Sequence, residues 1–158
     1  MLVLALVGVL AGLVAGNVGA FITGARHEPP ERVLKKAILD AIYETSETKY
    51  PTFLSYNQEE ASFEVSDASG NQISSHSIYK GDLGEDYELP EILFEAIAPM
   101  SGPDGEPAIY DDDELSLSKI AFHYGSSVPF SVKISFRRET SVLQFDPFSG
   151  FLLKNRNE

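Results

Sequence analysis

Residues 28–66 read EPPERVLKKAILDAIYETSETKYPTFLSYNQEEASFEVS, and this stretch decides the fold. Its first half carries apolar side chains at helical spacing, namely Val33, Leu34, Ala37, Ile38, Ala41 and Ile42. Pro29 and Pro30 favour a break followed by a new helix, because proline fits the first helical turn; Pro51 must lie beyond its end. Residues 61–66 alternate apolar and polar, as a half-buried strand does. The stretch predicts an amphipathic helix whose apolar face is covered by the strands that follow.

The chain downstream predicts further strands separated by turns. Polar turn signals at 57–60 and 67–71 divide a meander of strands at 51–56, 61–66 and 72–78. Alternation and turn residues then indicate strands at 120–124, 130–137, 142–145 and 151–153. Glycines and prolines between 80 and 114 indicate an extended excursion with one short helix at Pro90–Ile97. The predicted fold class is α+β, a long N-terminal helix followed by an antiparallel β-sheet domain.

Upstream of this domain the chain opens with an uncharged apolar run. Residues 1–25 contain no charged side chain, and at 1.5 Å per residue a helix of this length exceeds the ~30 Å hydrocarbon core of a bilayer. Gly8, Gly12 and Gly16 would share one helix face that allows another helix to approach closely. We expect a transmembrane helix at 1–25, its amphipathic continuation at 26–48 and a β-rich domain at 49–158. The alternative is a cleaved signal sequence with a site near Ala15 or Ala20.

The composition excludes several classes of partner and chemistry. The net charge is -12, with 24 acidic and 12 basic residues, so a phosphate backbone would be repelled and no nucleic-acid partner is expected. The chain has no cysteine, which rules out disulfides, thiolate zinc sites and a cysteine nucleophile. Its histidines, His27, His76 and His123, are too widely spaced for a zinc-binding pair along one helix. No serine-nucleophile elbow or phosphate-binding loop occurs, so we do not expect an enzyme.

One acidic cluster is a candidate metal site. Asp111, Asp112, Asp113 and Glu114 follow one another, with Asp104 and Glu106 just upstream. Oxygen ligands in a loop suit calcium, although the spacing differs from an EF-hand loop. The alternative is a solvated acidic loop that keeps the domain soluble. Apart from calcium, no cofactor is expected.

Three features together resemble a known family. The opening MLVLALVGVLA at 1–11 is similar to the hydrophobic stretch of prepilins. The helix at Val33–Tyr43 followed by a strand meander resembles the α-then-β domain of that family. The Phe145–Gly150 segment, FDPFSG, between the last two strands resembles the close of H-type minor pseudopilins of type II secretion systems. The chain therefore looks like a type IV pilin-like minor pseudopilin.

The resemblance implies a structural subunit of a pseudopilus that assists protein export. Its helix would sit in the bacterial inner membrane or pack with other pseudopilin subunits, with the domain in the periplasm. Prepilins carry a basic leader ending in glycine, followed by phenylalanine and a nearby glutamate, so we expect an in-frame leader upstream of Met1. The positive-inside rule, applied to Arg26, Arg32, Lys35 and Lys36, would instead place the domain in the cytoplasm. Two further alternatives are a minor pilin of a type IV pilus, serving adhesion or DNA uptake, and an exported binding module with a signal sequence.

Overall fold

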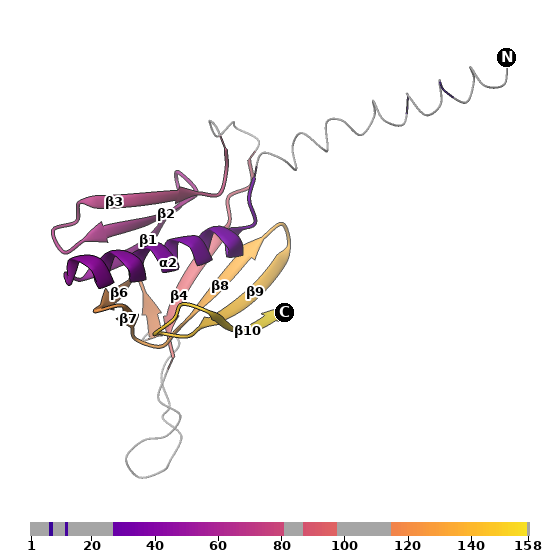
Figure 1. Cartoon of the computed structure of the whole chain (residues 1–158). Coiled ribbons are helices and arrows are strands. Elements are labelled where there is room, and N and C mark those ends of the chain that lie inside the picture. The colour runs from indigo at the N-terminus through magenta and orange to yellow at the C-terminus, as the bar shows by residue number, and fades with distance from the viewer. Residues whose placement is uncertain (1–6, 8–11, 13–26, 81–86, 98–114, 158) are drawn as a thin grey trace, which may run out of the picture.

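The domain is an α+β fold in which one long helix lies across two antiparallel sheets (Figure 1). The computed structural model describes Val7, Gly12 and residues 27–80, 87–97 and 115–157. The predicted class of helix plus antiparallel sheet is confirmed in this part of the chain. The predicted span at 1–25 lies, except for Val7 and Gly12, outside the described residues. No helix within the described ranges combines the length and the apolar character needed to cross a bilayer.

Helix α2 (Pro30–Thr48) begins and ends close to the prolines from which its limits were predicted. Pro30 occupies the first helical turn, where its missing N–H costs nothing. The residues before it are extended: His27 forms a bridge with Tyr79, and the Glu28 N–H donates to the Ile78 carbonyl over 2.8 Å. The break predicted at Pro29 and Pro30 is therefore present, and within the predicted stretch 26–48 the helix begins at Pro30.

The helix ends before Pro51, as predicted, through a left-handed cap. Lys49 has φ 63°, and its N–H donates to the Thr45 carbonyl over 3.1 Å. The buried Thr45 hydroxyl donates to the Tyr50 carbonyl over 2.7 Å. These bonds satisfy groups that the last helical turn would otherwise leave without partners.

The first sheet has the strand order β3-β2-β1-β6-β7. Its strands are β1 (Thr52–Asn57), β2 (Ser62–Asp67), β3 (Gln72–Ser77), β6 (Lys119–His123) and β7 (Ser126–Ser127). The first three form the predicted meander, and β6 pairs with the other edge of β1. Ser126 and Ser127, predicted as a turn, form a short strand instead.

The second sheet has the order β10-β9-β8-β4-β5. Its strands are β4 (Glu91–Ala96), β5 (Ser116–Leu117), β8 (Phe130–Phe136), β9 (Glu139–Phe145) and β10 (Leu152–Asn157). The turn predicted around 138–141 is shorter, because Arg137 and Arg138 alone connect β8 to β9. The last strand also runs further than the predicted 151–153.

The helix predicted at Pro90–Ile97 is wrong, because this segment is strand β4. It pairs with β8 from Glu91↔Ser135 to Ala96↔Phe130. Glu, Leu and Ala in the segment favour a helix locally. The ladder to β8 and burial of Phe94, which is 3% exposed, override that preference.

The core joins the helix to both sheets. The inner helix face packs on the first sheet, which contributes Leu54, Phe63, Val65, Ile120 and Phe122. The edge of the Phe122 ring meets Phe130 of the second sheet at 6.4 Å between centroids. Each large side chain buried this way contributes about 1.5–3 kcal/mol, so the sheets fix the helix firmly and with it the surface that the helix turns outward.

Candidate functional site

The described residues bring together one group with the side chains of a hydrolase, but not in a catalytic arrangement. Asp40 on α2 faces β3, where its Oδ2 atom lies 3.0 Å from His76 Nε2 and accepts a hydrogen bond from Ser74 Oγ. A serine nucleophile requires its hydroxyl to meet the histidine. Here both side chains meet the carboxylate instead, so the group joins the helix to the sheet.

Asp111, Asp112, Asp113 and Glu114 lie outside the described residues, as do Asp104 and Glu106. Within the described ranges, no three acidic or histidine side chains gather in a way that could hold a metal ion. Of the histidines, His123 ends β6 and is exposed.

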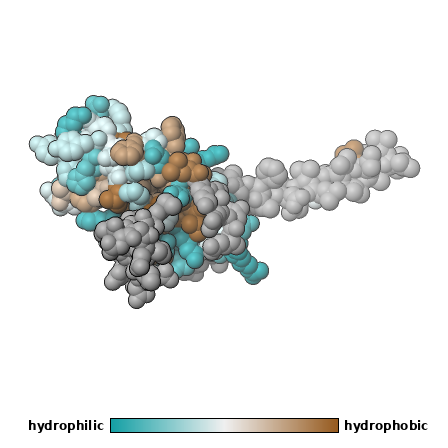
Figure 2. Space-filling view, turned by 90° about the horizontal axis from the view of Figure 1, so that it is seen from below, coloured by the Kyte–Doolittle hydropathy of each residue, from teal (hydrophilic) through white to brown (hydrophobic). Residues whose placement is uncertain are grey.

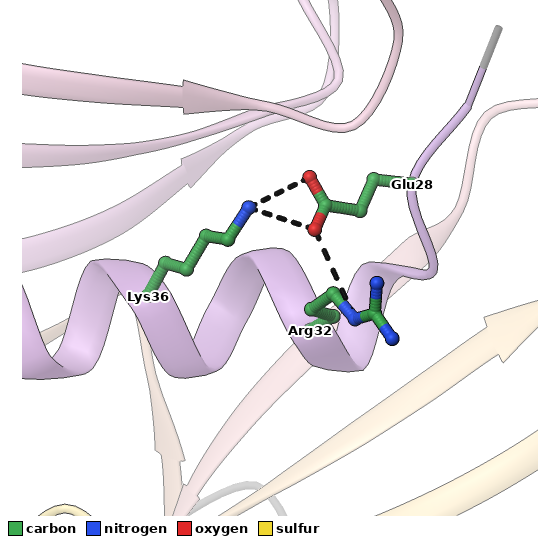
Figure 3. A network of polar contacts seen from close by, with 3 residues as sticks. All are labelled: Glu28, Arg32 and Lys36. Carbon is green, nitrogen blue, oxygen red and sulfur yellow. Dashed lines mark hydrogen bonds and ion pairs between the residues drawn. The ribbon is translucent and has the colours of Figure 1, made fainter.

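His27 marks the entrance of the chain into the domain. Its ring lies 6.3 Å from the Tyr79 ring and 6.1 Å from the Phe136 ring, measured between centroids. The next residue, Glu28, accepts two hydrogen bonds from Lys36 Nζ, at 2.7 and 2.9 Å (Figure 3). Arg32 Nε lies 3.9 Å from the same carboxylate. These contacts fix the direction in which residues 27–29 lead into α2.

Charge at this entrance stabilises the ionised form of Glu28. The hydrogen bond from Lys36 lowers the pKa of Glu28 below its ordinary value, and the charges of Lys36, Arg32 and Lys80 lower this pKa further. Burial alone would raise this pKa. The carboxylate of Glu28 at this entrance is therefore already paired with basic side chains of α2.

An exposed apolar surface runs along the outer side of α2, and we call it the α2 strip. Its members are Leu39, Tyr43, Tyr124, Phe148 and Phe151. Their exposed fractions run from 40% for Leu39 to 80% for Tyr124, so large apolar groups face solvent across neighbouring elements. Figure 2 shows hydrophobic residues gathered among hydrophilic ones on the face seen from below. Large apolar side chains exposed on neighbouring elements are typical of interaction sites.

Tight packing holds the elements of the strip together. Gly150, between Phe148 and Phe151, lies against the helix so closely that a Cβ there would be 2.9 Å from Ile38 Cγ2 and Ile42 Cδ1. Gly125, next to Tyr124, approaches Ser46 in the same manner. The Ser127 N–H donates to the Pro147 carbonyl over 2.9 Å, which ties the two turns to each other. The exposed aromatic rings therefore project from a rigid base.

Sequence reasoning did not identify this strip, although one signal was available. Leu39 and Tyr43 are spaced by four and lie outside the buried helix face, so they form an apolar pair on the polar side. Phe148 and Phe151 join that pair only through the fold, because the turn that carries them docks on α2 from more than 100 residues further along the chain.

Comparison with known proteins gives no match, either to a family model, to a curated protein or to a solved structure.

Proposed function

We propose that this chain is a structural, non-catalytic subunit, a minor pseudopilin of a type II secretion-like pseudopilus. In this proposal residues 1–25 anchor the chain in the bacterial inner membrane, and the domain stands in the periplasm. The same apolar helix would leave the lipid to pack with homologous helices during assembly. The support is the order of parts: an uncharged apolar run, an amphipathic helix, a strand meander and a closing hairpin around FDPFSG.

The observation that carries the proposal is the α2 strip. A monomeric domain rarely leaves three aromatic rings and a leucine–tyrosine pair exposed on one rigid base. Aromatic side chains are also the residues that dominate protein–protein contacts. In this proposal the α2 strip contacts neighbouring subunits from the side, and the apolar helix of residues 1–25 contacts them in the filament core. The two contacts together account for both apolar surfaces.

Protease treatment of spheroplasts tests the topology. Digestion of the domain from outside, with residues 1–25 retained in the membrane fraction, is the expected result. Degradation of the domain only after lysis would show that the domain lies in the cytoplasm, as the positive-inside rule suggests. This result would overturn the proposal. N-terminal sequencing of the mature protein provides a second check, since a start near Phe21 or later would mean that the apolar run is removed.

A further inference from the structure

The turn between β8 and β9 consists of two arginines in an unfavourable backbone conformation. Arg137 has φ 53° and Arg138 has φ 65°, between the paired residues Phe136 and Glu139. A two-residue hairpin turn with positive φ at both positions is formed most readily by Asn-Gly. Side chains with a Cβ destabilise it. Strain of this kind is concentrated at functional sites. The two guanidinium groups are therefore candidates for a functional role.

Among the described residues, no carboxylate forms an ion pair with either arginine. Both side chains are exposed, and no ion pair joins them to the described residues, although the chain holds 24 acidic side chains against 12 basic ones. The Arg137 guanidinium carbon lies 5.0 Å from the centroid of the Phe136 ring, which supports it from below. Two adjacent guanidinium groups that form no ion pair within the described part of the chain are suited to an anion from outside the domain.

The arginines line a groove at the entrance of the chain. The groove has a volume of about 710 Å³ and is also lined by His27, Ser141 and two acidic residues, Glu31 and the exposed Glu139. Glu31 Oε1 already accepts a hydrogen bond from Ser141 Oγ, at 3.2 Å. Figure 1 shows the β8–β9 hairpin at the end of the domain where the chain enters α2. The groove therefore opens beside the point at which residues 1–25 lead into the domain.

We propose that Arg137 and Arg138 bind the phosphate groups of anionic phospholipids at the membrane surface. This inference rests on the proposed function, because an anchor at 1–25 places His27, and with it the hairpin, in the headgroup layer. That layer adds about 5–8 Å on each side of the hydrocarbon core. The planar guanidinium fork matches phosphate oxygens in pairs. The net charge of -12 opposes any general attraction to an anionic surface, so the contact is local and holds the domain in one orientation.

A pair of variants separates this contact from fold stability. Arg137→Asn with Arg138→Gly removes both charges and installs the favoured turn, so its urea midpoint rises while lipid contact is lost. Lys49→Gly is the matched control, because Lys49 is also basic, exposed and left-handed at φ 63°. It lies at the opposite end of α2, away from the entrance. A merely structural role for the arginines would not give higher stability together with lower binding.

The contact itself is measured on the full-length chain in nanodiscs. Because the chain has no cysteine, Thr140→Cys carries a single fluorophore on a residue that lines the groove, and Ala68→Cys carries one in the distant β2–β3 turn. The discs contain either phosphatidylcholine alone or an equal mixture with phosphatidylglycerol, each with a nitroxide headgroup lipid as quencher. We expect quenching at position 140 in the mixed discs only, reduced about tenfold in the double variant, unchanged in Lys49→Gly, and weakened by salt.

Three outcomes overturn the inference. The first is equal quenching in both lipids, and the second is unchanged quenching in the double variant. The third is slower hydrogen exchange in the turn when inorganic phosphate is added to phosphatidylcholine discs. This result would mean that the arginines bind a free phosphate ion and not a lipid headgroup. A chain that does not stay with the discs at all contradicts the membrane anchor, whereas a chain that stays while position 140 remains unquenched contradicts the lipid contact alone.

Discussion

Gly150 is the residue whose replacement should destabilise the α2 strip most directly. It has φ 67°, and a Cβ would meet Ile38 and Ile42 at 2.9 Å. Gly150→Ala should therefore lower the free energy of unfolding by about 2–4 kcal/mol, from backbone strain and overpacking together. Gly70→Ala is the control, since Gly70 has φ 84° but nothing within 4 Å of a Cβ. Urea unfolding should give a loss of about 1 kcal/mol there; equal losses at both glycines would contradict the close approach.

Asp146 should make stability depend on acid pH. The Ser149 hydroxyl and N–H donate to its carboxylate and lower its pKa below the ordinary 3.8. A lowered pKa in the folded state stabilises the fold above pH 3.8, and this contribution is lost as pH falls through the folded value. The stability difference between the native chain and Asp146→Asn should therefore shrink in acid, as urea unfolding at several pH values would show. Ser149→Ala should remove much of the same pH dependence. A difference that stays constant into strong acid would contradict the assignment.

At the scale of elements, β4 offers a test of strand against helix. Phe94 points into the core, whereas its neighbour Leu93 is 39% exposed. Phe94→Ala should lower the free energy of unfolding by about 3–5 kcal/mol. Leu93→Ala should change it by about 0.5 kcal/mol, as at other surface positions. Urea unfolding of both variants measures these two changes. Comparable losses of unfolding free energy would contradict the alternation of buried and exposed side chains along a strand.

The elements that the sequence predicts correctly are those formed by local signals. The 3.6-residue spacing of α2 and the Asp67–Asn71 turn need no information from distant residues. Strand β4 does need it, because Phe94 pairs with Val132 across 38 positions. The turn between β8 and β9 was predicted at 138–141 but lies at Arg137 and Arg138, since arginine carries no turn signal that would fix its position. The two halves of the α2 strip likewise meet only in the folded chain.

The α2 strip should be needed for assembly of the protein with its neighbours but not for folding of the domain. Tyr43→Ser with Phe148→Ser removes two exposed rings, 60% and 74% exposed, so the urea midpoint should hardly change. Truncating an aromatic interface residue costs about 2 kcal/mol or more of binding free energy, and the amount of protein exported by cells carrying the variant should fall sharply.

Ile73→Ser is the matched control for this double variant. Ile73 is 42% exposed and lies on β3, at one edge of the first sheet. The opposite edge of this sheet is β7, next to the turn that carries Tyr124 of the α2 strip. Export should be normal in this control at equal protein levels. If Ile73→Ser impairs export as much as the double variant, loss of exposed apolar area in general would explain the defect. The α2 strip would then not be the specific contact between subunits.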